Sequence, residues 1–465
     1  MTTTTASPSL SSPELPPTTR SIASIFQSPV GRLVMLLLLW LLLQIPLSMI
    51  TNLVHERQAR RDEAVVDVTG KWGGAQQLMG PILRLPYIVN TTDAKGNLRQ
   101  ERRAAYLLPE NLLIEAKLNT EERRRGIFSI PVYGAGLHIT GHFQRPDVSA
   151  WIGTGNEALW QEMELQIGLS DVRAIHADGQ LTWNGQAHAL EPSAGSGAPA
   201  AGVHIPLGKT IAAGNDAFGS DGRSNFELNL KFNGSGSLHL APTGRNSKAT
   251  VQADWGDPSF QGAWLPTESQ VQADRFSATW SISYLGRGYP QQWTSDGDLN
   301  VDVLNAQVFG VALLPAIDAY RMAERVTKYA VLAAFFTFLT IWLTEVLARR
   351  PVHPVQYLFL GAALTLFGLL QLSIGEHFGF EAGFVAATIA VTGMVTAYSR
   401  SVLDGWLRAF MVGGLLGGLY GYLYLLLSAE DYALLGGSIA LFAGLGIVML
   451  LTRRIDWHRL GASST

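Results

Sequence analysis

Residues 33–50 read LVMLLLLWLLLQIPLSMI, a run of eighteen residues without a charged side chain. An α-helix rises about 1.5 Å per residue, so a run of this length nearly crosses the roughly 30 Å hydrocarbon core of a bilayer. A cleaved signal peptide is the competing interpretation, but the run exceeds a typical signal core and no small-residue cleavage site follows it. We therefore predict an uncleaved transmembrane helix at residues 33–50.

The sequence before this run is polar and rich in Ser, Thr and Pro. Residues 1–20 contain ten Ser or Thr and four Pro. Such a composition cannot bury enough apolar surface to offset the entropy of ordering the chain. We expect residues 1–32 to form a disordered tail.

The long segment after the run, residues 51–328, is charged and interrupted by Gly, Pro, Asn-Gly and Asp-Gly. Three stretches alternate polar and apolar residues with period two, which is typical of half-buried antiparallel strands. They are Phe226 to Phe232, Ser235 to Leu240 and Phe276 to Tyr284. Eight of the twelve Trp also lie in this segment and can fill a core between sheets. We predict one large β-rich domain, inserted between the first and second transmembrane helices.

The composition limits the chemistry of this domain. The chain has no Cys, which excludes disulfides, thiolate metal ligands, iron–sulfur clusters and Cys nucleophiles. The β-rich domain therefore has to fold on its apolar core alone. The 34 Lys and Arg nearly balance the 37 Asp and Glu, which excludes a bulk binder of polyanions such as nucleic acid.

After Pro315 the hydrophobic pattern becomes helical and predicts five further membrane spans. Arg321, Arg325 and Lys328 recur at helical spacing directly before the first of these spans, so we expect a basic helix at the lipid headgroups. The spans are expected at Tyr329 to Leu347, Tyr357 to Gly375, Ala382 to Ser399, Ala409 to Leu427 and Tyr432 to Leu451. The predicted fold is a six-span α-helical membrane protein, with a five-span bundle at 329–451 and a cytoplasmic tail at 452–465.

The short connectors between the spans indicate the orientation of the chain. Every second connector carries Arg, and the alternate connectors carry only acids among their fixed charges. The arginines are Arg349, Arg350, Arg400, Arg408, Arg453, Arg454 and Arg459, and the acids are Glu376, Glu381, Glu430 and Asp431. Because cytoplasmic loops retain Lys and Arg, we expect both termini in the cytoplasm and residues 51–328 outside it. Arg57, Arg60 and Arg61 argue locally for the opposite orientation, but long translocated domains are only weakly governed by charge.

Several segments occur together, and in order, in both the β-rich and the membrane part. They are Tyr106 to Glu110, Arg125 to Tyr133, Asp257 to Pro266, Phe276 to Trp280, Pro290 to Trp293, Phe309 to Tyr329, Glu345, His353 to Tyr357 and Glu376 to Phe380. This combination resembles the CreD family, the cell envelope integrity proteins of the bacterial inner membrane. The resemblance implies a periplasmic β-rich domain, control by the Cre two-component system, and roles in envelope maintenance, colicin tolerance and responses to β-lactams. It implies no catalytic residues.

Ionisable residues inside or beside the apolar runs are candidate functional residues. Glu345 lies four residues before Arg349, so it forms either an interfacial ion pair or a proton or ion relay. Glu376 and His377 lie at the outer end of the third span, either in an exposed connector or in a site between bundle and domain. The sequence does not decide between the alternatives for Glu345, or between those for Glu376 and His377.

The basic residues Arg321, Arg325 and Lys328 are the candidate contacts for a lipid or another ligand. They either anchor the helix to headgroups or recognise a lipid-linked envelope precursor. The bilayer is thus the first expected partner of this protein.

Three glycines of the fifth span, Gly413, Gly417 and Gly421, repeat every four residues. Small residues at this spacing let helix backbones approach closely. We expect them to pack the fifth span against the sixth, or against a second subunit in a homo-oligomer.

Complete catalytic motifs are missing from the sequence, which contains neither HExxH nor GxSxG. His138 and His142 lie in a stretch that we expect to be extended, which separates them by about 13 Å, too far for one metal ion. We predict no enzyme activity, cofactor or metal. The favoured function is a stress-responsive envelope-integrity factor that binds a periplasmic protein or ligand. The alternative is a transporter or lipid-handling protein, and an enzyme acting on an envelope polymer is a weaker third hypothesis.

Overall fold

The chain divides into two compact units, one formed by residues 1–59 and 318–465 and the other by residues 60–317. The computed structural model describes residues 29–92, 97–148, 157–193, 201–208, 217–297, 301–313, 319–348, 352–403, 405–428 and 433–453. Most of the two predicted tails, at 1–32 and 452–465, lies outside these residues.

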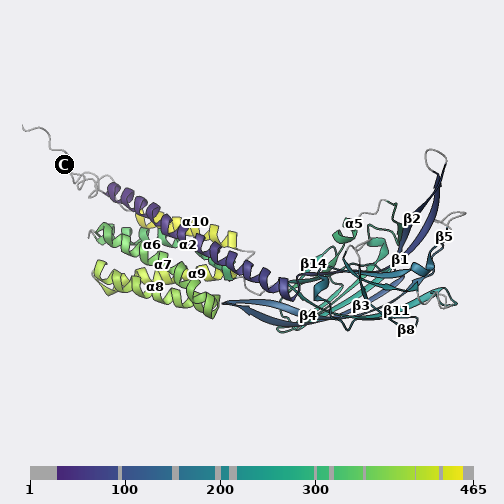
Figure 1. Ribbon diagram of the computed structural model, residues 1–465. Coiled ribbons are helices and arrows are strands. Elements are labelled where there is room, and N and C mark those ends of the chain that lie inside the picture. The colour runs from purple at the N-terminus through teal and green to yellow at the C-terminus, as the bar shows by residue number, and fades with distance from the viewer. Residues whose placement is uncertain are drawn as a thin grey trace, which may run out of the picture. The chain divides into compact units, whose positions relative to one another are not determined.

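The first unit is a bundle of long apolar helices (Figure 1). They are the first part of α2 (Pro29–Trp72), followed by α6 (Ala319–Ala348), α7 (Pro354–Phe378), α8 (Phe380–Leu403), α9 (Trp406–Ser428) and α10 (Ala433–Thr452). Five of them, α2 and α6 to α9, are long and apolar enough to cross a membrane, and α10 contains a shorter apolar helix at Leu435–Ile447. The span at 33–50 and the five later predicted spans all coincide with helices.

The start of α7 is defined by its capping residues. The Nδ1 atom of His353 accepts a hydrogen bond from Val355 N at 3.3 Å, and Gln356 Oε1 accepts one from His353 N at 3.0 Å. Pro354 occupies the first turn, where its missing N–H would have had no partner within the helix. These contacts satisfy donors that a helix start leaves unpaired.

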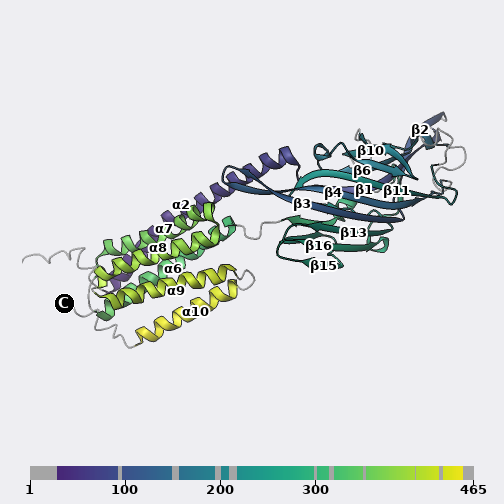
Figure 2. The same cartoon turned by 90° about the horizontal axis from the view of Figure 1, so that it is seen from below.

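The second unit consists mainly of two β-sheets (Figure 2). The first sheet has the order β14 (Pro258–Gly262), β18 (Phe309–Leu313), β12 (Ser237–Leu240), β1 (Gln76–Thr92), β6 (Glu164–Leu169), β10 (Gly202–Pro206) and β9 (Glu191–Pro192). Its further strands are β2 (Leu98–Leu107) and β5 (Glu157–Ala158), which pair with β1, and β17 (Gln292–Thr294), which pairs with β2.

The second sheet contains the longest hairpin of this unit. Its order is β15 (Glu268–Val271), β16 (Phe276–Ser283), β13 (Asn246–Ala253), β3 (Asn111–Arg125), β4 (Phe128–Gln144), β11 (Arg223–Ser235), β7 (Gln180–Trp183) and β8 (Gln186–Ala189). The short helices of the unit are α5 (Val301–Ala306) and 3-10 turns at Trp160–Glu162, Val172–Ala174 and Tyr284–Gly286. The three predicted strand segments are confirmed as β11, β12 and β16, with β12 beginning two residues later than expected.

One apolar core joins the two sheets. It combines inward residues of β1, β6 and β10 with inward residues of β3, β4, β11, β13 and β16. Trp183 and Trp280 are among its largest side chains, and both are fully buried. Residues in these strands alternate between the core and the outer face, as period two requires. The β-rich domain is therefore a two-layer sandwich.

The helix α2 continues far beyond the apolar run that ends at Ile50, whereas the sequence pattern placed the β-rich domain from residue 51 onward. It ends at Trp72 because Gly73 follows. Gly73 has a φ of +144°, and a Cβ atom there would lie 2.6 Å from the carbonyl oxygen of Asn233. Only glycine tolerates both conditions.

The last turns of α2 are helical because the tip of the β3–β4 hairpin packs along them. Ala64 is buried against the apolar side chains of β4. Arg125 forms an ion pair with Asp67 at 3.2 Å, and the guanidinium of Arg123 lies 4.3 Å from the ring centroid of Trp72. Residues distant in sequence thus stabilise a charged helical segment that has no strong apolar pattern of its own.

A buried arginine connects three loops at one end of the sandwich through hydrogen bonds. The Nη1 atom of Arg287 donates to the carbonyl oxygens of Pro242 and Thr243 at 3.0 and 2.9 Å, and Nη2 donates to Gln291 Oε1 at 2.6 Å. Gln291 in turn donates to the carbonyls of residues 108 and 109. Arg287 is 9% exposed, and this burial lowers the pKa of its guanidinium.

The aromatic neighbour of this guanidinium completes the arrangement. The hydroxyl of Tyr289 donates to the carbonyl oxygen of Pro242 at 2.9 Å, and its ring centroid lies 4.7 Å from the guanidinium carbon of Arg287. Burial raises the pKa of Tyr289 to about 12, so its hydroxyl stays protonated and able to donate even at alkaline pH, where an ordinary tyrosine ionises. The loops that follow β2, β12 and β16 are therefore held together by one cation.

We expect Arg287→Met to lower the free energy of unfolding by about 3 kcal/mol, because buried carbonyl oxygens lose their charged donors. Urea unfolding of the full chain in detergent, followed by Trp fluorescence, measures this change. The control is Arg275→Met, since Arg275 is exposed and pairs with Asp274 only at the surface. Its effect should stay below about 0.5 kcal/mol. Equal effects of the two variants would contradict the role assigned to Arg287.

Candidate functional site

The outer face of the second sheet carries three shallow depressions along β3 and β13. Their volumes are about 500, 470 and 440 Å³. The first two share Lys117 and Gln252, and the third lies beside the second, at Leu113 and Lys248. Because β3 and β13 run parallel and in register, the three depressions follow one line. We call this feature the β3–β13 trough.

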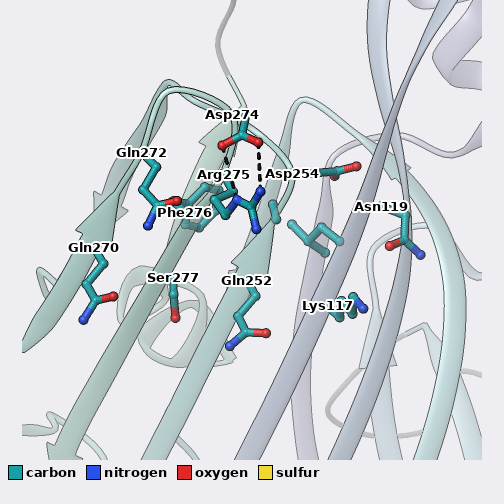
Figure 3. A pocket seen from close by; sticks show the side chains of 12 residues that line it. Lys117, Asn119, Gln252, Asp254, Gln270, Gln272, Asp274, Arg275, Phe276 and Ser277 are labelled. Atoms are coloured by element: carbon teal, nitrogen blue, oxygen red, sulfur yellow. Dashed lines mark hydrogen bonds and ion pairs between the residues drawn. The ribbon is translucent and has the colours of Figure 1, made fainter.

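Side chains with amide, hydroxyl or amino groups line the trough. Figure 3 shows one end of it, where Gln252, Gln270 and Ser277 project from three neighbouring strands on the same face of the sheet. The other exposed or half-buried amides and hydroxyls of the lining are Asn111, Asn119, Thr140, Asn229, Asn246, Thr250, Gln272, Ser281 and Ser283. Amides and hydroxyls both donate and accept hydrogen bonds. The trough can therefore match a ligand that carries both kinds of group.

The alternation of the strands explains why these side chains gather on one face. In β13, Ala249 and Val251 are buried in the core, whereas Lys248 and Gln252 point outward. On β4, which flanks β3 on the side away from β13, Gly136 pairs with Lys117 and has no side chain to fill the space above the sheet. The trough is thus built from long side chains beside small ones.

The fixed charges of the trough nearly balance. The cations are Lys117, Lys231, Lys248 and Arg275, and the acids are Glu115, Asp254 and Asp274. Asp274 accepts hydrogen bonds of 3.2 and 3.0 Å from Arg275, and these bonds lower the pKa of its carboxyl group. Asp254 Oδ1 accepts a bond of 2.7 Å from Thr120 N. The two acids at this end of the trough are therefore engaged within the protein.

The two histidines that the sequence raises as a metal pair lie on β4, and the predicted extended conformation is confirmed. The Nδ1 atom of His138 lies 2.9 Å from Asn229 Oδ1, at the edge of the trough. Within the described ranges, no group of three or more metal-ligating side chains could hold an ion.

In the bundle, Glu345 is buried where α6 contacts α7. Its side chain is 2% exposed, and its Oε2 atom accepts a hydrogen bond of 2.8 Å from the hydroxyl of Tyr357. Arg349, the ion-pair partner that the sequence suggests, lies outside the described residues. A buried acid in an apolar helix is costly, and the Tyr357 hydroxyl offsets part of that cost.

A second tyrosine–carboxylate contact joins the same two helices at their other ends. The hydroxyl of Tyr320 on α6 donates a bond of 3.1 Å to Glu376 Oε1 on α7, and Arg57 Nε of α2 lies 3.7 Å from the same oxygen. His377, which the sequence groups with Glu376, is exposed. Each helix thus supplies a tyrosine at its start and an acid toward its end. We call these two contacts the Tyr–Glu clamps.

The basic residues predicted before the second span form the first turns of α6. Arg321 and Lys328 are exposed, and Arg325 is half-buried. Lys328 Nζ lies 2.7 Å from Glu324 Oε1, so part of the positive charge available to headgroups is neutralised within the helix. The structure brings Glu376, but not Glu345, to the same end of the bundle as these cations.

Two of the three glycines in α9 face α8. A Cβ atom at Gly413 would overlap Thr396, and one at Gly417 would lie 3.8 Å from the side chain of Thr392. A Cβ at Gly421 would have no heavy atom within 4 Å. The close packing indicated by the sequence is therefore found against α8 and not against α10, because a period of four defines a ridge without specifying which helix fills it.

The sequence pattern alone does not single out Tyr320 and Tyr357, because tyrosine at the edge of a span is equally expected as an interfacial anchor. The sequence signal that could have identified these tyrosines is their position in the helices. In a pair of antiparallel helices, a residue at the start of one lies opposite the end of the other, where the acids occur. The β3–β13 trough has no motif, and only the pairing of distant strands reveals it.

We expect Tyr357→Phe to destabilise the bundle by about 1–3 kcal/mol, because the buried carboxylate loses a donor. Its ring contact with Phe338 is retained in this variant. The measurement is the thermal unfolding midpoint of the purified protein in detergent. Tyr398→Phe is the matched control, since Tyr398 packs on Phe359 through its ring. Similar midpoints for the two variants would show that the Glu345 contact contributes nothing.

Comparison with known proteins places the chain in one family. The family model for the inner membrane protein CreD matches residues 28–458. The inner membrane protein CreD of Escherichia coli strain K12 is 32% identical over 423 residues, which is 90% of this chain and 91% of that protein. The match includes both the β-rich unit and the helices. The chain belongs to the CreD family of inner membrane proteins.

Proposed function

We propose that the protein spans the inner membrane six times, with both termini in the cytoplasm and the β-rich unit in the periplasm. The charge of the short connectors supports this orientation. Arg400 and Arg408 flank the connection between α8 and α9, whereas Glu376 and Glu381 flank the connection between α7 and α8. Basic residues are retained on the cytoplasmic side, so successive connectors lie on opposite sides and α10 returns the chain to the cytoplasm.

The absence of Cys gives a direct test of this orientation. A single Cys is introduced at Gln270, on the β-rich unit, or at Thr465. We expect a membrane-impermeant maleimide to label Gln270→Cys in intact spheroplasts and Thr465→Cys only after lysis. The reverse pattern would contradict the proposed orientation.

The same proposal extends to the role of the protein: it supports envelope integrity and the response to envelope stress without catalysing a reaction. It does so by binding a periplasmic protein or ligand through the β-rich unit, while the bundle holds that unit at the membrane. The β3–β13 trough is the observation that carries this proposal. The side chains of Lys117, Gln252 and Gln270 form no hydrogen bond or ion pair within the part of the chain that the structure describes, so their polar groups are available to a ligand.

Envelope sensitivity tests this role. We expect the double variant Lys117→Ala, Gln252→Ala to raise sensitivity to detergents and large antibiotics to the level of cells that lack the protein, at unchanged protein abundance. The control is Gln100→Ala, an exposed position on β2 in the other sheet. Wild-type resistance in the double variant would contradict a binding role for the trough.

A transport or lipid-handling role is the second candidate, and the Tyr–Glu clamps favour it. Ionisable residues at membrane depth often mark proton or ion paths, and Arg321, Arg325 and Lys328 offer cations to lipid headgroups. Glu345 and Glu376 lie at opposite ends of the same helix pair, where a relay would need its entrance and exit.

The two acids can be tested without removing the acceptor oxygens of the clamps. Under the transport hypothesis, Glu345→Gln and Glu376→Gln each make cells as sensitive to detergents and large antibiotics as cells that lack the protein, at normal protein abundance. The reason is that an amide cannot carry a proton as a carboxyl group does. Under the binding hypothesis both variants behave as wild type. Capture of lipid by a photoreactive residue at Arg325, with none at Gln252, would also favour lipid handling.

A further inference from the structure

The β3–β13 trough is long enough for an extended ligand. Its two central strands pair in register over eight residue pairs, from Asn246 with Asn111 to Ala253 with Leu118. At roughly 3.3 Å per residue, this register spans about 26 Å. The three depressions occupy successive parts of that length. A small compact metabolite would fill one depression, whereas a linear polymer would contact all three.

The charge of the lining argues against an anionic polymer. Anion sites concentrate Arg and Lys of one sign, but here Glu115 lies between Lys117 and Lys248 along the trough. Arg275 is already paired with Asp274. The lining therefore offers little net charge to a polyphosphate, a nucleic acid or an acidic polysaccharide.

The scarcity of exposed apolar side chains argues against a protein or an acyl chain. Protein interfaces are centred on buried aromatic, aliphatic or Arg anchors. In the trough, Leu113 is the one apolar side chain that points outward from the described parts of β3 and β13, and it is already partly covered. Phe276, which also borders the first depression, is buried in the core.

What remains is a ligand that presents many neutral donors and acceptors along its length. Glycans built from amino sugars have this chemistry, because each unit carries hydroxyl groups and an acetamido group. Side-chain amides such as those of Gln252 and Gln270 can pair with both kinds of group. The outward residues of each strand recur every two residues, which places a side chain about every 7 Å along a bound chain of sugars.

We propose that the β3–β13 trough binds a neutral, linear, acetamido-bearing glycan. This inference rests on the proposed function, since it identifies the ligand of the β-rich unit in the periplasm. Each sugar contributes only hydrogen bonds that replace bonds to water, so single units bind weakly and affinity is gained by occupying successive depressions.

The test uses the purified full-length protein in a zwitterionic detergent, because detergents with sugar headgroups would compete. The probes are the dimer and the hexamer of N-acetylglucosamine, and binding is measured by calorimetry. We expect the hexamer to bind at least about tenfold more tightly than the dimer. The double variant Lys117→Ala, Gln252→Ala should weaken hexamer binding about tenfold or more. Gln100→Ala, on the other sheet, should bind as wild type.

Three results would overturn the proposal. They are no hexamer binding by the wild-type protein, equal binding by the trough variant, and tighter binding of a polyglutamate of similar length. Unchanged unfolding curves show that the variants remain folded, since the substituted side chains are exposed. Capture of an envelope protein at Gln252, without glycan binding, would overturn the glycan proposal while leaving the proposed binding function in place. If the protein neither captures an envelope protein nor binds the glycan, the glycan proposal and the proposed binding function are both refuted.

Discussion

The apolar core between the two sheets is the interaction on which the β-rich unit depends. The chain has no Cys, so no disulfide limits the unfolded state, and stability has to come from burial at about 25 cal/mol per Å² of apolar surface. Fully buried side chains such as Trp183 and Trp280 supply much of that area. Once these residues point inward, the pleat turns their neighbours outward. The polar trough is thus a direct consequence of the core.

The bundle is governed by a different constraint, because an apolar surrounding offers no water to a buried polar group. Glu345 and Glu376 each accept a tyrosine hydroxyl from the neighbouring helix. The two contacts are reciprocal, since α6 and α7 each give one tyrosine and one acid. They fix the register of α6 against α7 at both ends of the pair. Apolar packing between the two helices specifies this register less well.

Much of this fold could be predicted from the sequence, where the periodicity is strong. The apolar runs predicted the six bundle helices that lie in the described residues, and alternation predicted β11, β12 and β16. The helical segment from residue 51 to Trp72 could not be predicted, because its order depends on a hairpin tip that lies about sixty residues later, as between Ala64 and β4. The candidate acids Glu345 and Glu376 lie toward the ends of α6 and α7, but their tyrosine partners depend on how the two helices meet. The trough was invisible for a similar reason: β3 pairs with β13 across more than 120 residues, and no local pattern encodes that register.

The two units therefore differ in whether a substitution can change ligand binding without changing folding stability. In β13, Val251 is fully buried while Gln252 is exposed, so a change at one position alters the core and a change at the next alters only the trough. In the bundle, the same carboxylates would serve both as clamps and as any relay, and a single substitution affects both properties. The outer face of the sandwich can consequently acquire or lose ligand contacts at little cost in folding free energy. This separation is a physical reason to place ligand recognition on the β-rich unit and anchoring in the helices.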